Sequence, residues 1–336
     1  MPIASLCLQL AGATITILAA SHFLAKSADV ISFKTGLGHS LIGVVLLATA
    51  TSLPELGTGV SSVTLVHSPD LAAGSIFGSN LFNLMIIGLL DIFWRNGPIL
   101  TTVDTSAVLV SVLGIGVIAI AGSAIVIHSM TTATSTWPIS PVSIVLIIAF
   151  AGSLFMIYRF ERAQDDNEIE ANSEYAEASG TAATMMYLMS AGVILGSAIW
   201  LAQIGDSVAE EMGLEASFVG TQFLAVSSSL PELATSVAAI RINAPSLAIS
   251  NLVGSNLFNM GFALFMTDAA FTEGALWSNV SPIHTLTSIV AVIMTAVVII
   301  ALINRCRTRP NRFWTFEAAM LIGLYVGASI LVFQLG

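Results

Sequence analysis

The chain of 336 residues is 56% hydrophobic and 9% charged, whereas charged residues make up about a quarter of an ordinary soluble domain. Its mean hydropathy of +0.92 excludes a typical soluble globular protein. The formal net charge of −10 includes ten Lys and Arg residues that form no basic patch, so nucleic-acid binding has no support. Several windows are apolar over the roughly 20 residues that a helix needs to cross a bilayer. The composition therefore predicts an all-α polytopic membrane protein.

Ten apolar segments follow one another along the chain, and we predict that each forms a transmembrane helix. Turn-forming residues separate them, and the stretch from Lys26 to Gly36 is expected to be one of these breaks. Residues 161–182 are rich in acids and are predicted to form a hydrated cytoplasmic linker. The predicted spans are 3–25, 39–66, 70–93, 105–127, 141–159, 183–203, 217–240, 246–267, 283–304 and 314–334.

The cationic residues all fall on one side of the predicted membrane, because they follow the odd-numbered spans. By the positive-inside rule this side is cytoplasmic, so both termini are expected to be extracytoplasmic. We predict an integral protein of the plasma (inner) membrane. The cationic residues are Lys26, Lys34, Arg95, Arg159, Arg162, Arg241, Arg305, Arg307, Arg309 and Arg312.

Two segments of the chain nearly repeat each other. The first contains Thr51-Ser52-Leu53-Pro54-Glu55 and then Gly78-Ser79-Asn80-Leu81-Phe82-Asn83, and the second contains Ser228-Ser229-Leu230-Pro231-Glu232 and then Gly254-Ser255-Asn256-Leu257-Phe258-Asn259. The spacing from the glutamate to the final asparagine differs between the copies by a single position. Five predicted spans separate the copies, and because five is odd, the second copy enters the membrane in the opposite sense. We therefore predict two inverted-topology five-helix repeats, over residues 1–160 and 183–336.

Each copy places a glutamate beside a proline in apolar surroundings. A carboxylate is costly in hydrocarbon and by default marks a functional site, which favours such a role for Glu55 and Glu232. Each proline removes a helical hydrogen bond and frees the carbonyl of Ala50 or Ser227. Helix packing remains the alternative for any single serine. The hydroxyl and amide residues predicted to complete the site are Thr51, Ser52, Ser79, Asn83, Ser228, Ser229, Ser255 and Asn259.

These groups are all hard oxygen donors, and no Cys or His cluster lies near them in the sequence. Such a set suits calcium or sodium and argues against zinc or copper. One Ca²⁺ or two Na⁺ would neutralise two carboxylates, so the site can bind either cation, and competition between them is the basis of exchange. The expected partners are Ca²⁺, Na⁺ or H⁺ and the lipid bilayer. No cofactor is expected, and no oligomer is required.

The paired motifs resemble the two alpha repeats of the sodium/calcium exchangers, within the cation/calcium exchanger superfamily. The motif match covers about residues 39–90 and 216–266. The resemblance implies that Glu55 and Glu232 coordinate Ca²⁺, that the hydroxyls and amides above complete the cation sites, and that the first and sixth spans slide against the rest as a gate. The short 161–182 linker resembles that of a prokaryotic-type member without a large regulatory loop. Asn259 stands where potassium-dependent relatives carry Asp, which argues against potassium coupling.

The leading hypothesis is a secondary active antiporter that exchanges Na⁺ for Ca²⁺ by alternating access at a mid-membrane site. A Ca²⁺/H⁺ or other cation/H⁺ antiporter is the alternative, because glutamates can also carry protons. A cation channel is favoured less, since inverted repeats with broken helices are typical of transporters. An enzyme is not expected, because the sequence has no convincing buried Ser-His or paired-aspartate arrangement.

Overall fold

The computed structural model describes residues 3–35, 48–94, 96–130, 139–162, 179–241, 243–304 and 315–335. Within these ranges the regular structure is entirely helical, and eight helices are long and apolar enough to cross a membrane. The count rises to nine if the bent pair Ala216–Ser228 and Leu230–Arg241, with an angle of 41° between its parts, forms one span. The prediction of an all-helical polytopic membrane protein is thereby confirmed.

The helices follow one another without strands in the part of the chain that the structure describes. Two of the short elements, η2 and η6, are 3-10 turns, and η4 and η5 are π-helical turns within longer helices. The elements are α1 (Ile3–Thr35), α3 (Leu53–Thr64), α4 (Pro69–Phe93), η2 (Ile99–Thr101), α5 (Ser106–Met130), α6 (Pro141–Arg162), α7 (Gly180–Met212), α8 (Ala216–Val219), η4 (Gly220–Leu224), α9 (Ala225–Ser228), α10 (Leu230–Arg241), α11 (Pro245–Phe258), η5 (Asn259–Ala263), α12 (Leu264–Ala270), η6 (Leu276–Ser278), α13 (Ile283–Asn304) and α14 (Phe316–Leu335).

Most predicted spans agree with the structure to within a few residues. α4, α5, α6, α11 to α12, α13 and α14 lie where spans three, four, five, eight, nine and ten are expected. Span two is described only from residue 48 onward. Both ends of the predicted 161–182 linker are corrected, because α6 continues to Arg162 and α7 begins at Gly180. The remaining linker residues, 163–178, lie outside the described residues.

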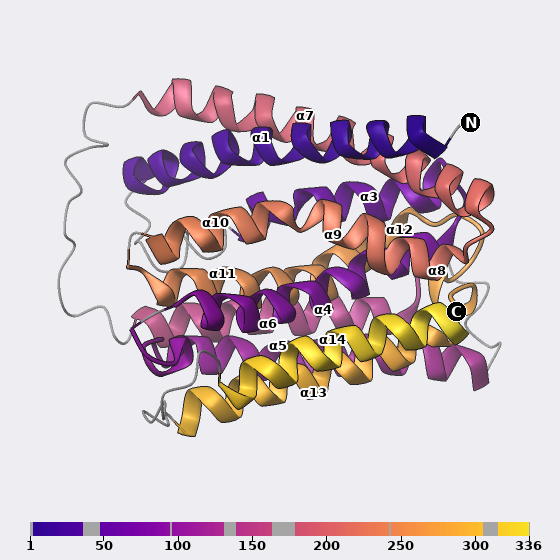
Figure 1. Ribbon diagram of the computed structural model, residues 1–336. Helices are drawn as coiled ribbons and strands as arrows, with labels where there is room; N and C mark the ends of the chain where they lie inside the picture. Colours follow the sequence, from indigo (N-terminus) through magenta and orange to yellow (C-terminus); the bar gives the residue numbers. More distant parts are fainter. Residues whose placement is uncertain are drawn as a thin grey trace.

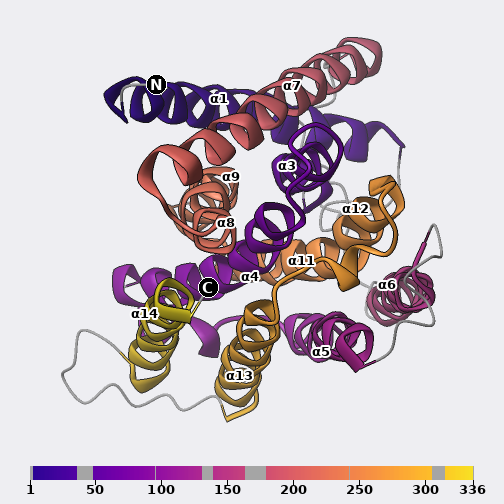
Figure 2. The same cartoon turned by 90° about the vertical axis from the view of Figure 1, so that its right-hand side faces the viewer.

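Two helices are much longer than predicted. α1 and α7 have 33 residues each, where spans of 3–25 and 183–203 are expected. The predicted break at Lys26 is wrong, because no Pro or Gly lies between Lys26 and Gly36 and polar residues do not by themselves end a helix. α7 ends at Met212 and is followed by Gly213, whose left-handed backbone (φ 61°) is a common helix stop. The two long helices lie side by side along one edge of the bundle (Figures 1 and 2).

The centre of the bundle is formed by α4 and by the α11–η5–α12 helix, which lie inside the other helices (Figure 2). In their most apolar windows 83% and 89% of the residues are buried, against 22% in α1 and in α14. The polar side chains of a helix enclosed in this way need partners inside the bundle, from protein groups, bound water or an ion. The polar residues of the repeated motifs on α4 and α11 are all buried there.

Glycines allow α4 to approach α8 and η4 closely. A Cβ atom on Gly78 would lie 2.5 Å from the backbone oxygen of Thr221, and one on Gly74 would lie 2.7 Å from the backbone oxygen of Ser217. No side chain fits at either position without moving a backbone. Small residues of this kind let helices pack tightly in a membrane, where close contact drives association.

A buried aspartate joins three helix ends. Asp268, in α12, is fully buried and accepts hydrogen bonds from the backbone N–H of Leu276 (2.8 Å) and of Ser140 (2.9 Å). These donors begin η6 and precede α6. Asp91, at the end of α4, makes the equivalent bond to the N–H of Ile99 (2.8 Å). Both carboxylates therefore fix the turn that follows a central helix.

Asp268→Ala is expected to destabilise the protein by about 3 kcal/mol, because two buried N–H groups lose their acceptor. The thermal unfolding midpoint of the detergent-purified protein measures this. The control is Asp104→Ala, which removes an exposed carboxylate. Equal midpoints for the two variants would contradict the role given to Asp268.

Candidate cation site

The two repeated motifs break their helices in the same way. Pro54 and Pro231 have no N–H to donate, and the chain turns at the serine two residues before each. Ser52 has φ −90° and ψ 5°, and Ser229 has φ −90° and ψ 8°. α3 and α10 begin at the next residue. The sequence repeat is therefore also a repeat of backbone conformation.

Both glutamates are fully buried, and each accepts a hydrogen bond from the other motif. The Ser229 hydroxyl donates to Oε1 of Glu55 at 2.6 Å, and the Ser52 hydroxyl donates to Oε1 of Glu232 at 3.3 Å. Ser79 of α4 also donates to Oε1 of Glu55, at 3.3 Å. Segments from opposite halves of the chain thus form one polar centre.

The other hydroxyls pair across the two segments in the same reciprocal manner. The Oγ1 of Thr51 lies 3.4 Å from the Oγ of Ser255, and the Oγ of Ser79 lies 3.4 Å from the Oγ of Ser228. All four are fully buried. The structure therefore brings every predicted hydroxyl residue into the network around the glutamates.

The two residues whose backbone carbonyls are predicted to bind the cation lie next to this network. Ala50 and Ser227 are buried and immediately precede Thr51 and Ser228. Thr51 also contacts Oδ1 of Asn251, at 3.5 Å, a residue that the motif comparison did not indicate. No pattern in the sequence distinguishes this asparagine from other small polar residues of α11.

The predicted amides behave differently from each other. The Nδ2 of Asn83 donates to Oδ1 of Asn256 at 3.0 Å, and Asn256 donates to the carbonyl oxygen of Asn80 at 3.2 Å. Asn259, which opens the π turn η5, has neither amide atom hydrogen-bonded to a described residue. Within the described part of the chain, neither Asn83 nor Asn259 is hydrogen-bonded to a glutamate. Sequence reasoning missed Asn256, although the repeated Gly-Ser-Asn motif was a signal for it.

Several buried oxygens in this region have no hydrogen-bond partner among the described residues. Leaving a buried polar atom without a partner costs about 1–3 kcal/mol, unless water or an ion bonds to it. Carboxylate, amide and hydroxyl oxygens are the ligands that Ca²⁺ and Na⁺ prefer. The arrangement can therefore hold a hard cation. The atoms are Oε2 of Glu55 and of Glu232, and Oδ1 of Asn83 and of Asn259.

A helical membrane bundle that buries two carboxylates among hydroxyls is typical of a cation transporter. A family model described as sodium/calcium exchanger protein matches residues 5–159 and 182–334. The chain belongs to this family of transporters, which confirms the resemblance seen in the motifs and supports cation/Ca²⁺ antiport.

Individual proteins are similar to the chain in sequence or in fold. Inner membrane protein YrbG of Escherichia coli (strain K12) is 26% identical over 262 residues, which cover 75% of this chain and 76% of the relative. The fold is similar to that of the sodium-calcium exchanger NCX_Mj, with a TM-score of 0.63, 20% identity and 98% of each chain covered. It is also similar to that of the H⁺/Ca²⁺ exchanger CAX, with a TM-score of 0.72, 13% identity and coverage of 98% of this chain and 86% of that one.

Proposed function

We propose that this chain is a secondary active antiporter that exchanges Na⁺ for Ca²⁺ across the plasma (inner) membrane. The observation that carries the proposal is the reciprocal bonding of two buried glutamates, each to the serine of the other motif. One centre built from two halves of a chain is the expected architecture of a transporter that binds its ions near the middle of the bilayer. Membership of the exchanger family supports the same reading.

In this proposal Glu55 and Glu232 coordinate Ca²⁺ directly. The hydroxyls around them, with the amides of Asn83 and Asn259 and the carbonyls near Ala50 and Ser227, complete the cation sites. Ca²⁺ takes about six to eight oxygen ligands, and the unpartnered oxygens of the region are available to it. Na⁺ competes because the same oxygens suit both ions and two carboxylates balance either charge.

Alternating access would follow from ten helices in two inverted repeats, 1–160 and 183–336, joined by the cytoplasmic linker, with both termini outside. The two halves of the chain are also alike outside the motifs. Gly97 and Gly274 are separated by the same number of residues as Glu55 and Glu232, and both have a positive φ, of 111° and 117°. Asp91 and Asp268 share this offset and their bonding pattern. α1 packs mainly against α7 at the edge of the bundle. Two helices that slide together as a gate would need such a position.

A proton-coupled Ca²⁺ antiporter is the second candidate. Buried glutamates can exchange protons as well as metal ions, and the fold is similar to that of an H⁺/Ca²⁺ exchanger. The two candidates differ in which gradient drives calcium.

The deciding experiment is Ca²⁺ uptake by the full chain in liposomes, with Na⁺, K⁺ and H⁺ gradients imposed one at a time. We expect uptake to require an opposing Na⁺ gradient and to persist when a protonophore removes any pH gradient. Uptake that a pH gradient drives without Na⁺ would establish the second candidate instead. Uptake indifferent to every gradient would contradict antiport.

A further inference from the structure

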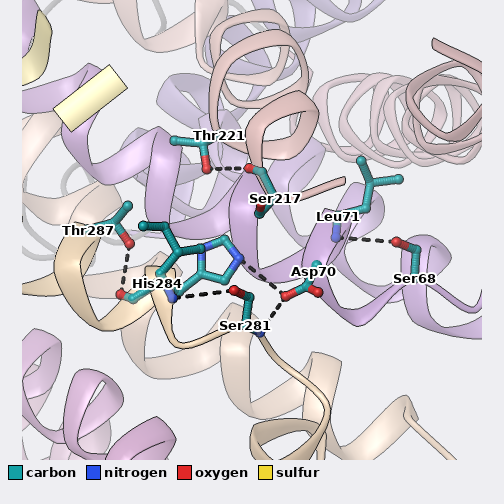
Figure 3. A network of polar contacts seen from close by, with 9 residues as sticks. Ser68, Asp70, Leu71, Ser217, Thr221, Ser281, His284 and Thr287 are labelled. Carbon is teal, nitrogen blue, oxygen red and sulfur yellow. Dashed lines mark hydrogen bonds and ion pairs between the residues drawn. The ribbon is translucent and has the colours of Figure 1, made fainter. Parts of the chain in front are cut away.

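A buried histidine at the start of α13 faces an acid at the start of α4. The side chain of His284 is fully buried, and its ring stacks on that of Phe77, with centroids 5.9 Å apart and planes at 15°. Its Nε2 lies 3.5 Å from Oδ1 of Asp70, and Figure 3 shows the ring pointing at the carboxylate. Neither ring nitrogen has a hydrogen-bond partner among the described residues. A buried polar ring without a partner is unusual in a folded protein.

Asp70 connects helices that are far apart in sequence. Its Oδ1 accepts a hydrogen bond of 2.5 Å from the backbone N–H of Ser281, two residues before α13 (Figure 3). The equivalent contact in the other copy of the repeat has an uncharged acceptor. There the hydroxyl of Ser246, the second residue of α11, accepts a hydrogen bond from the backbone N–H of Asp104, two residues before α5. Where α13 has its histidine, α5 has Ala107. Of the two matching contacts, the one at Asp70 alone contains an ionisable pair.

The other polar groups drawn around the ring already have partners. The hydroxyl of Thr287 donates to the carbonyl of His284 at 2.8 Å, and the hydroxyl of Thr221 donates to the carbonyl of Ser217 at 2.7 Å (Figure 3). Both donors are neutral and bonded to backbone. They leave the carboxylate of Asp70 as the charged group within reach of the imidazole.

Other ionisable groups lie away from His284 or have partners of their own. Glu317 lies in the first turn of α14, close in sequence to Thr315, whose hydroxyl donates to Asp91 at the opposite end of α4 from Asp70. The other pairs are Glu273 with the exposed His67, His128 with Ser140, and Tyr325 with Gln222. Asp70 is therefore the acid that faces His284.

We propose that Asp70 and His284 form a proton-binding site, separate from the cation site, that controls the contact between α4 and α13. A proton added to the ring gives an imidazolium in which both nitrogens carry a hydrogen, so that Nε2 can donate a charge-assisted hydrogen bond to Asp70.

The proton at this site is a regulator and not a transported ion. α4 carries Asp70 in its first turn and Ser79 and Asn83 further along, so a change in its contact with α13 reaches the cation site through one rigid helix. By the proposed orientation the site lies at the outer end of α4. This regulatory consequence rests on the proposed antiport, whereas the proton site itself does not.

The site is tested directly by NMR of the full chain in nanodiscs with isotope-labelled histidine rings. The chain has five histidines, and the His284 signal is the one missing from His284→Gln. If that variant does not fold, removing the other histidines one at a time assigns the signal by elimination. We expect the ring nitrogens to show the doubly protonated signal once the sample is acidified, and Asp70→Asn to weaken that signal under the same conditions. A ring that never takes up a second proton, or an identical signal in Asp70→Asn, overturns the proposal.

The regulatory role is tested by Ca²⁺ flux in liposomes while the pH on the outer side is varied. We expect the wild-type rate to change at least about fivefold between about pH 8 and about pH 6, as for typical coupling between sites, and His284→Gln to lose this response. His67→Gln, which removes the exposed histidine, should keep it. An unchanged response in His284→Gln overturns the regulation. If the chain uses a coupling ion other than Na⁺, the NMR result is unaffected. Failure of the proposed Na⁺/Ca²⁺ exchange can therefore be distinguished from failure of the proton site.

Discussion

Replacing either Glu55 or Glu232 with glutamine is expected to lower Ca²⁺ transport by about a hundredfold or more, because ligand charge sets calcium affinity over several decades. Glutamine keeps the size of the side chain and one carbonyl oxygen. That oxygen can still accept the bond from Ser229 or Ser52, so the folded state should survive. The loss should therefore be one of ion binding and not of structure.

The measurement is sodium-driven Ca²⁺ flux in liposomes, together with the thermal unfolding midpoint of each variant. Glu273→Gln is the matched control, because it removes the same charge from a side chain that is 59% exposed. The control should transport normally. Near-normal flux in either Glu55→Gln or Glu232→Gln would remove that glutamate from the proposed site.

Gly78→Ala is expected to destabilise the protein by about 3 kcal/mol, the upper part of the usual range for overpacking. The added methyl group would lie 2.5 Å from the backbone oxygen and 2.7 Å from the Cα of Thr221, so α4 and η4 would have to separate. Since α4 also carries Ser79, the separation should reduce transport as well as stability.

The control for this variant is Gly114→Ala in α5, where nothing lies within 4 Å of the added Cβ. In a helix interior Gly→Ala by itself is favourable by about 1 kcal/mol. The two variants should therefore shift the unfolding midpoint in opposite directions, as measured on detergent-purified protein. A midpoint for Gly78→Ala equal to or above that of the wild type would contradict the close packing of α4 on η4.

Helix positions were predictable because a bilayer imposes a length on apolar segments and because Pro and Gly mark their ends. The errors at α1 and α7 have one cause. Polar residues such as Lys26 and Glu210 suggest the end of a span, yet a helix continues beyond the hydrocarbon until a stop such as Gly213. Hydropathy reports where the membrane ends and not where the helix ends.

The spacing between the two copies of the motif shows a second limit of prediction from the sequence. The sequence offset from Asn83 to Asn259 is one position shorter than the offset from Asp91 to Asp268, so the second copy gains a residue between its asparagine and its aspartate. The π turn η5 lies in that interval, and a π turn contains one residue more than an α-helical turn. The change in spacing is visible in the sequence, but its placement in a π turn at Asn259 is visible only in the structure.

The candidate site divides in the same way. Its residue types and their two copies were readable from the sequence, because a carboxylate beside a proline stands out in an apolar chain. The pairing was not: Ser229 bonds Glu55 and Ser52 bonds Glu232, so each hydrogen bond joins the two copies. Contacts across 174 and 180 residues depend on how α3 and α10 pack.

By itself the amino-acid sequence determined that the chain forms apolar helices, where most of them lie, and that two matched motifs carry the acids. These are local properties, set by hydropathy, proline and spacing along one helix. The tertiary structure alone decided which hydroxyl meets which glutamate, how closely α4 lies to η4, and that His284 faces Asp70. Such contacts depend on the relative placement of whole helices, which no local pattern specifies.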